Sequence, residues 1–304
     1  MDAGFRSYWR TQTAAGTRIV MDSPPDREDV RPWLRVRAML VDGGVRVPQV
    51  LAEDIEQGFL LIEDLGPRTY LDVFKADASA ADAMMDAAVG QLLKLQSITP
   101  PDDFPAYDEA MLRRELKLFD EWFLGRHLGV TLGCADLEAL DLIHRRLIDA
   151  ALAQPQVLVH RDFMPRNLMP ADEGPAVLDF QDALRGPIAY DALSLFKDAF
   201  WSWQPAQRVD IWLARYHARA QDAGLPVQSL ARFRRDADWI GVQRHLKVMG
   251  IFARLNYRDG KPKYLADAPR FLDYLDAIVP NYPELAPLND VLDRHVRPVL
   301  RSAP

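Results

Sequence analysis

Two carboxylates and one amide stand at a spacing that suits phosphoryl transfer. Asp162 and Asn167 lie in the segment 159–167, and Asp179 follows a short apolar run. Transfer of a phosphoryl group needs one side chain to receive the proton of the attacking hydroxyl, and oxygen ligands for the magnesium ion that bridges the phosphates. We predict that Asp162 is the catalytic base and that Asn167 and Asp179 hold the metal.

Two short strands must position these groups. The β-branched and aliphatic run from Gln156 to His160 predicts a strand that delivers the first carboxylate at its end. The run from Ala176 to Phe180 predicts a second strand for the other carboxylate, and Pro165 between them favours a loop over a helix. Because the turn residues 172–175 suit a tight connection, we expect the two strands to pair with each other. His160 itself is expected to be a buried histidine that bonds to backbone.

Composition restricts the class of protein. The 304 residues carry a formal charge of -7 and a pI near 5.4, which argues against nucleic acid as a partner. The single Cys134 cannot form an internal disulfide, so a reducing cytoplasm is expected. No apolar run approaches the roughly 20 residues that span a bilayer, and no obligate protein partner is evident. The sequence therefore indicates a cytoplasmic protein.

The pattern along the chain changes near residues 64–67, where turn residues follow an apolar strand. Before them, apolar and β-branched runs predict a small sheet with one crossing helix between about Arg27 and Val41. The later residues show mainly helical periodicity. These features predict an α+β fold with a division into residues 1–65 and 66–304. The expected strands are 5–10, 17–21, 48–53 and 58–63.

These residues resemble the aminoglycoside phosphotransferase and choline kinase group, small-molecule kinases with a protein-kinase fold. Within that group they look most like the bacterial anomeric sugar kinases that phosphorylate N-acetylmuramate and N-acetylglucosamine at C1 during cell-wall recycling. The resemblance implies a bilobal fold, with a small nucleotide-binding lobe containing an antiparallel sheet and a larger, mainly helical catalytic and substrate-binding lobe. The stretches that carry it are residues 2–10, 20–25, 58–66, the Asp162 loop, 179–183, 186–187 and 190–191.

The resemblance also implies ATP and Mg²⁺ as cofactors. Residues 2–10 would form the loop over the ATP phosphates, and residues 63–65 would be the hinge whose backbone binds adenine. Relatives usually carry sequence before that loop, which leaves open whether this chain is truncated. The expected nucleotide contacts are Gly4, Phe5, Arg6, Glu63, Asp64 and Leu65.

One departure from the protein-kinase pattern concerns the lysine that clamps the α- and β-phosphates. The matching strand ends in Met21 instead. Phosphate charge still needs a cation, so we expect Arg6 to supply part of it, with Arg10 or Arg18 as alternates. Solvated charges at a strand edge explain these arginines equally well.

The acceptor should bind within reach of Asp162. Glu115 borders the apolar face of a helix expected over residues 108–123 and could bind sugar hydroxyls, although a salt bridge to Arg114 or another basic side chain is the alternative. The lactyl carboxylate of N-acetylmuramate could meet Arg166 or Arg185, or the basic group of Arg254, Arg258 and Lys261, which an ordinary solvated surface explains about as well. Asp182 is either structural or a substrate contact.

We therefore expect an ATP-dependent kinase acting on the anomeric hydroxyl of N-acetylmuramate, N-acetylglucosamine or both. Two alternatives remain. One is an aminoglycoside or amino-alcohol kinase, since a net charge of -7 also suits cationic acceptors. The other is a nucleotide-binding regulatory module without turnover, suggested by Met21.

Overall fold

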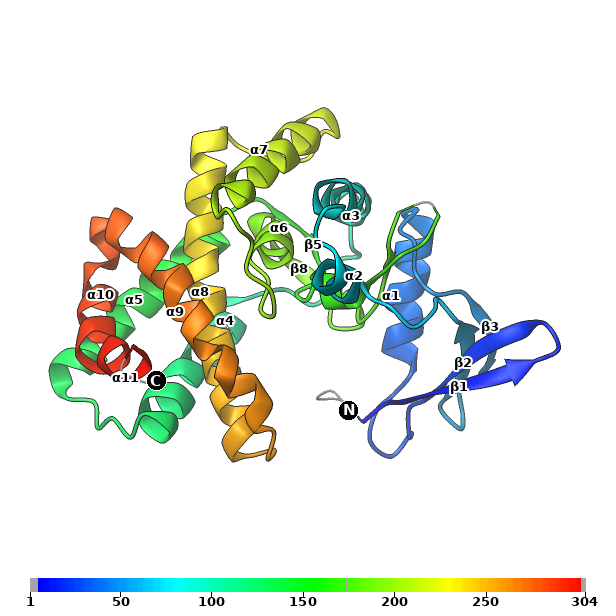
Figure 1. The fold of residues 1–304 in the computed structure, drawn as a ribbon, viewed down its shortest axis with the longest axis horizontal. Coiled ribbons are helices and arrows are strands. Elements are labelled where there is room, and N and C mark those ends of the chain that lie inside the picture. Colours follow the sequence, from blue (N-terminus) through cyan, green and yellow to red (C-terminus); the bar gives the residue numbers. More distant parts are fainter. Residues whose placement is uncertain (1–4, 173, 302–304) are drawn as a thin grey trace. The chain divides into compact units, whose positions relative to one another are not determined.

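The computed structural model describes residues 5–172 and 174–301, and its elements are labelled in Figure 1. Packing divides the chain into two compact units. Unit 1 contains the described residues up to Phe104 together with Val157–Leu184 and Asp222–Leu225. Unit 2 contains Pro105–Gln156, Arg185–Gln221 and the described residues from Pro226 onward. The division into residues 1–65 and 66–304 remains a prediction about lobes.

A four-stranded antiparallel sheet forms the first part of unit 1. Its strands are β1 (Ser7–Thr13), β2 (Gly16–Asp22), β3 (Val50–Asp54) and β4 (Phe59–Glu63), in the order β1-β2-β4-β3. The four expected strands are all present, with ends shifted by a few residues. Met21 on β2 pairs with Leu60 on β4, and both side chains are fully buried. The residue at the usual lysine position therefore belongs to the core of the sheet.

Helix α1 (Arg31–Asp42) follows the first hairpin and buries Trp33, Val36 and Leu40 along one stripe. The helix was expected from about Arg27, but it begins later because residues 24–28 form a turn closed on the carbonyl of Pro24. It ends at Gly43, where an added Cβ would lie 2.3 Å from Ile98 Cδ1. The remaining helices of unit 1 are α2 (Tyr70–Ala76) and α3 (Ala81–Gln96).

The segments that carry Asp162, Asn167 and Asp179 contain four short elements. These are β5 (Gln156–Val159), a 3-10 turn (Pro165–Asn167), β6 (Leu168–Met169) and β7 (Ala176–Val177). Strand β7 pairs with β6, so the expected pairing of β7 with β5 is wrong. The second strand also ends earlier than expected, because Asp179 has φ of +62° and cannot continue a β conformation. The loop expected at Pro165 is a short 3-10 turn, which proline tolerates at its first position.

Unit 2 is built around the long helix α8 (Leu230–Tyr257), against which α4 (Glu109–Leu118), α5 (Cys134–Leu152), α6 (Ala189–Phe196) and α9 (Ala268–Ile278) pack. Asp108 caps α4 by accepting a hydrogen bond from the N–H of Met111 at 2.8 Å. Gly250 lets α8 approach α4 closely, since an added Cβ would lie 2.3 Å from the carbonyl carbon of Leu118.

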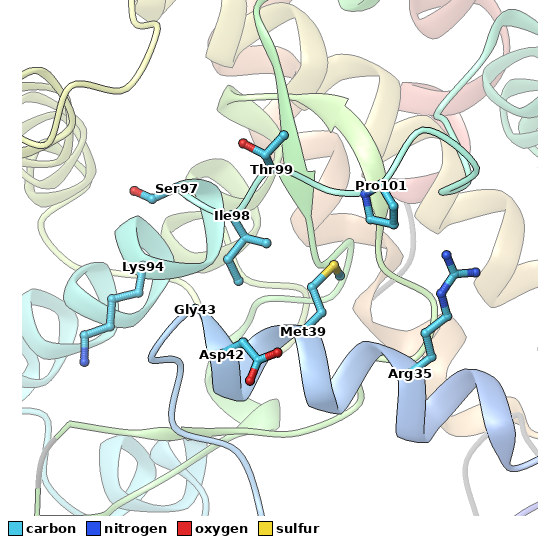
Figure 2. A pocket seen from close by; sticks show the side chains of 9 residues that line it. All are labelled: Arg35, Met39, Asp42, Gly43, Lys94, Ser97, Ile98, Thr99 and Pro101. Atoms are coloured by element: carbon cyan, nitrogen blue, oxygen red, sulfur yellow. The ribbon is translucent and has the colours of Figure 1, made fainter.

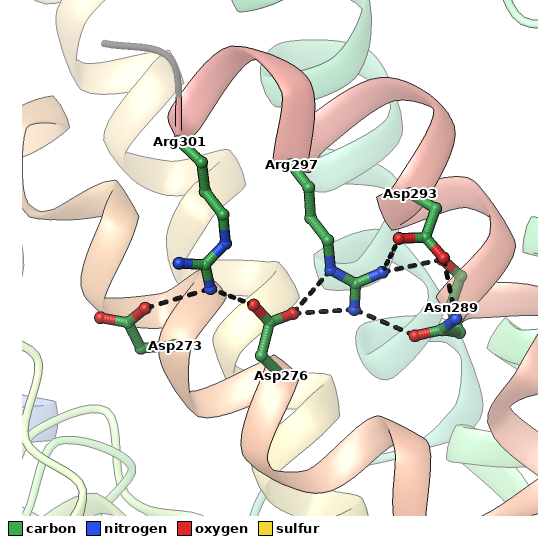
Figure 3. Close-up of polar contacts among 6 residues, drawn as sticks. All are labelled: Asp273, Asp276, Asn289, Asp293, Arg297 and Arg301. Carbon is green, nitrogen blue, oxygen red and sulfur yellow. Dashed lines mark hydrogen bonds and ion pairs between the residues drawn. The ribbon is translucent and has the colours of Figure 1, made fainter. Parts of the chain in front are cut away.

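Shorter elements complete unit 2. An ion cluster ties its last helix to α9: Arg297 binds Asp276 and Asp293 at 2.7 and 2.6 Å, and Arg301 also binds Asp276 (Figure 3). The other elements are β8 (Leu184–Pro187), α7 (Gln207–Asp222), α10 (Ala286–Val291), α11 (Arg297–Leu300), π-helices Phe119–His127 and Leu292–Val296, and 3-10 helices Pro262–Asp267, Val279–Asn281 and Pro283–Leu285.

The expected α+β class is confirmed by an antiparallel sheet near the start of the chain and a mainly helical remainder. Within the described residues, no helix combines the length and apolar character needed to cross a membrane.

Candidate active site

The segments that carry Asp162 and Asp179 share an unusual backbone conformation. Strand β5 ends at Val159, and Arg161 two residues later has φ of +76°. Among the described residues other than glycine, only Arg161 and Asp179 have positive φ. L-residues adopt such angles at an energetic cost, and these conformations cluster at functional sites where surrounding contacts hold them. The two positions therefore lie in the two segments for which the sequence predicts catalytic and metal-binding residues.

Hydrogen bonds join these segments to each other. The N–H of Leu178 donates to the carbonyl of Asn167 at 2.9 Å, and the carbonyl of Leu178 lies 2.9 Å from His160 Nε2. The side-chain amide of Asn167 donates to the backbone carbonyl of Asp162, also at 2.9 Å. Since Leu178 directly precedes Asp179, these contacts bring the backbone positions of the expected base and of both expected metal ligands together.

His160 fixes this arrangement from the core. A carbonyl only accepts hydrogen bonds, so the contact with Leu178 requires a proton on His160 Nε2. Its Nδ1 then accepts from the N–H of Asp162 at 3.2 Å. His160 is fully buried, and the expected structural role as a backbone-bonded histidine is confirmed.

Asp179 points its carboxylate toward solvent while its neighbour anchors the segment. Asp179 is exposed, and its Oδ1 accepts from the amide of Gln181 at 2.9 Å. The same amide lies 3.3 Å from Oδ2 of the exposed Asp182. Phe180 is buried with its ring centroid 5.0 Å from that of Trp33 on α1. The carboxylate is therefore accessible on a segment with a fixed backbone.

The donor atoms suit magnesium better than a metal that the protein encloses. Among the described residues no group of three or more His, Cys, Asp or Glu side chains could hold a metal ion. Magnesium does not need one, because it commonly binds one or two carboxylates and completes its shell with water and substrate phosphates. Asn167 donates through its nitrogen, which leaves its amide oxygen for a ligand, and Asp179 offers its second carboxylate oxygen.

Of the segment expected over the ATP phosphates, residues 2–10, the structure describes residues 5–10, and Gly4 lies outside the described residues. Ser7 to Arg10 belong to β1, in line with the strand expected over residues 5–10, and the role of this segment over the phosphates remains a prediction. Phe5 is 59% exposed, with the guanidinium of Arg27 5.5 Å from its ring centroid. Arg6 forms an ion pair with Glu28, with Nε 2.7 Å from Oε1.

The expected hinge uses its carboxylates within the protein. Burial raises the pKa of Glu63, but hydrogen bonds from Arg46 at 2.5 Å and from the N–H of Gln49 outweigh that effect and keep the pKa below its usual value. Asp64 accepts two hydrogen bonds from Arg10, at 2.7 and 2.9 Å, which lower its pKa to about 2. The carboxylates of Glu63 and Asp64 are therefore engaged within the protein, and Leu65 is half-buried. Nucleotide contact by residues 63–65 remains a prediction.

Of the expected acceptor contacts, Arg166 and Asp182 lie in the same segments as the catalytic candidates, and their roles remain predictions. Arg166 is half-buried within the 3-10 turn.

Glu115 lies in unit 2 and is 7% exposed. Its carboxylate pairs with Lys247 at 2.9 Å, accepts from Gln243 at 3.1 Å and from the hydroxyl of Tyr107. Glu115 thus forms the internal salt bridge that was the alternative to substrate contact, and its partner is Lys247 and not Arg114. Contact between Glu115 and the acceptor remains a prediction.

Two residues that position the candidate site could not be predicted from their residue types. Leu178 acts through its backbone, and an apolar residue in an apolar run carries no signal of that role. Glu28 sits among other charged residues in the turn before α1, so nothing distinguished it as the partner of Arg6.

A separate hollow of about 500 Å³ lies between α1 and the end of α3, lined among others by Arg35, Met39 and Lys94 (Figure 2). None of the expected site residues lines it. It is therefore not part of the candidate site.

Comparisons with known proteins agree with this chemistry. A model of the phosphotransferase enzyme family matches residues 1–227. The N-acetylmuramate/N-acetylglucosamine kinase of Pseudomonas putida is 50% identical to this chain, and the match covers 96% of this chain and 85% of that protein. The N-acetylmuramate/N-acetylglucosamine kinase of Pseudomonas aeruginosa is 51% identical, and the match covers 96% of this chain and 86% of that protein. A choline kinase structure from Streptococcus pneumoniae superposes with a TM-score of 0.61 at 14% identity, covering 89% of this chain and 90% of that one, which shows a shared fold alone.

Proposed function

This chain belongs to the phosphotransferase enzyme family, and on that premise we propose that it is an ATP-dependent kinase of N-acetylmuramate, N-acetylglucosamine or both. The observation that carries the proposal is the set of hydrogen bonds that holds the backbone positions of Asp162, Asn167 and Asp179 together. The choice of sugar is supported by relatives at about half identity that bear this name.

The side chains take the roles that phosphoryl transfer requires. Asp162 accepts the proton of the attacking hydroxyl, which must come within hydrogen-bonding distance of its carboxylate. Asn167 and Asp179 would hold magnesium through their free oxygens, and a bound magnesium ion neutralises charge on the phosphates. The backbone of residues 63–65 meets adenine, while Phe5 and Arg6 lie at the phosphate end.

The proposal extends to the acceptor atom. We infer that the anomeric C1 hydroxyl is phosphorylated, as expected for an enzyme that returns cell-wall sugars to metabolism in the cytoplasm. Asp182 and Arg166 are the candidate contacts for the sugar, because they lie beside the proposed metal ligands in the chain.

A coupled assay of ADP release tests the substrate class. The acceptors to compare are N-acetylmuramate, N-acetylglucosamine, choline, homoserine and an aminoglycoside, each with ATP and magnesium. We expect turnover with one or both amino sugars. Turnover confined to choline or the aminoglycoside would replace the proposed function with the cationic-acceptor alternative.

The acceptor atom needs its own control. The methyl glycoside of N-acetylglucosamine has an alkylated C1 oxygen and should not be phosphorylated, whereas free N-acetylglucosamine should be. Equal turnover of both would exclude C1.

The base is tested by Asp162→Asn. This change should lower kcat by about 100- to 10,000-fold while ATP still binds, because general-base catalysis contributes about that much. Unchanged activity would favour a binding module without catalysis.

A further inference from the structure

We propose that Arg6, positioned by Glu28, is the cation that binds the ATP phosphates in place of the lysine missing at Met21. This inference rests on the proposed function. In protein kinases a strand lysine does this work while paired with a helix glutamate. Met21 cannot do so, since its side chain is apolar and fully buried in the sheet.

The two alternate arginines are bound elsewhere. Arg10 makes a bidentate pair with Asp64 and also donates to the carbonyl of Gly66 at 3.1 Å. Arg18 donates to carbonyls of its own hairpin, those of Thr17 at 2.6 Å and Ala15 at 3.0 Å. Both guanidinium groups therefore serve the hinge and the turn.

Arg6 differs in burial and in bonding. Its side chain is only 11% exposed, and Nε lies 2.7 Å from Glu28 Oε1. Its Nη1 is buried and has no acceptor among the described residues. A buried charged donor without a partner is costly, and a phosphate oxygen would satisfy it. The planar guanidinium can bind Glu28 along one edge and an anion along another.

The surroundings of Tyr8 place this pair near the proposed metal end. Loss of solvation raises the pKa of the Tyr8 phenol; Arg6 opposes the rise, while the charges of Asp179 and Glu28 add to it. The Arg6–Glu28 ion pair and the carboxylate of Asp179, the proposed metal ligand, therefore both lie close enough to Tyr8 to act on its phenol. Arg6, Tyr8 and Arg10 share one face of an extended segment, because side chains alternate along a strand. Arg10 on that face reaches the hinge at Asp64.

This face of the segment therefore extends from the hinge, where adenine is expected, toward Asp179, where the phosphates are expected. Arg6 stands at the phosphate end of that face.

Calorimetric titration with ATP and with adenosine, both in the presence of magnesium, tests the assignment without any acceptor. Arg6→Gln should weaken ATP binding about tenfold or more, since a charge-assisted hydrogen bond is lost. Adenosine binding should be unchanged, which a merely structural role would not predict. Arg6→Lys should restore part of the ATP affinity.

Glu28 is a positioning residue, and a double-mutant cycle tests that role. Glu28→Gln should weaken ATP but not adenosine binding, and the double variant with Arg6→Gln should lose no more than Arg6→Gln alone. The exposed ion pair of Arg31 and Glu56, at 3.4 Å, provides matched controls in Arg31→Gln and Glu56→Gln, which should bind ATP normally.

The outcomes separate the two proposals. ATP affinity within twofold of the unchanged protein in Arg6→Gln would overturn the role of Arg6 and leave the proposed function intact. An unchanged protein that fails to bind ATP would overturn the proposed function itself.

Discussion

His160 holds the carbonyl of Leu178 at 2.9 Å from its Nε2, so a buried imidazole on the base segment fixes the residue that directly precedes Asp179. The same ring accepts from the N–H of Asp162. One side chain thereby sets the backbone on both sides of the candidate site. A substitution of His160 therefore tests the alignment of Asp162 and Asp179 without changing either of these residues.

His160→Phe keeps a planar ring but removes both hydrogen bonds. We expect kcat to fall about 10- to 100-fold, as for other residues that orient catalytic groups. The half-saturating magnesium concentration should rise as well, since Asp179 loses its alignment. Steady-state kinetics at varied magnesium measure both effects.

The matched control is His217→Phe, which removes a hydrogen bond of 2.7 Å to the carbonyl of Gln228 within unit 2. That variant should lose about 1 kcal/mol of unfolding free energy and retain kcat. Equal kcat in the two variants would remove His160 from the positioning role.

Glu115→Gln should destabilise the protein by about 3–5 kcal/mol, because it breaks a buried ion pair by removing the carboxylate that lies 2.9 Å from the ammonium of Lys247. Adding Lys247→Met should recover much of this loss. Chemical denaturation of the single and double variants measures the recovery.

The double variant also separates the two roles considered for Glu115. If Glu115 serves only the internal network, the stable double variant keeps the KM for the amino sugar. A KM that stays raised after stability has recovered would indicate direct contact with the acceptor.

The ion pair of Asp64 and Arg10 should appear in acid unfolding. The pKa of Asp64 is lowered in the folded protein to about 2, so the stability that it contributes is complete above the unfolded pKa, near 4. That stability is lost as the pH falls from about 4 to about 2. Asp64→Asn should flatten the dependence of unfolding free energy on pH in this window.

Urea unfolding between pH 2 and 5 measures the slope. The exposed Asp26, which lies 4.0 Å from Arg27 Nε, gives the control Asp26→Asn. The same loss of slope in both variants would mean that the pair with Arg10 is not its source.

Gly250→Ala should destabilise unit 2 by about 1–3 kcal/mol through overpacking. The added Cβ would lie 2.3 Å from the carbonyl carbon of Leu118 and 2.5 Å from its oxygen, and backbone atoms cannot turn aside. Gly133→Ala is the comparison, since an added Cβ there meets no atom within 4 Å. Thermal unfolding should show a lower Tm for Gly250→Ala than for Gly133→Ala.

Much of the candidate site could be read from residue types. Asp162, Asn167 and Asp179 lie within one short stretch, and the chemistry of phosphoryl transfer needs these groups at close spacing. The strands of the first sheet were also evident, because apolar alternation and turn residues are local signals. The pairing of β7 was not, since strands of two residues carry little pattern to choose between partners.

The sequence by itself determined the class of chemistry and the residues available for it. The tertiary structure decided which charges meet: Arg6 with Glu28, Arg10 with Asp64, and Glu115 with Lys247. The physical reason is that charged residues far apart in a chain offer many possible pairs of similar energy. Only the packing of the elements that carry them brings one pair within hydrogen-bonding distance.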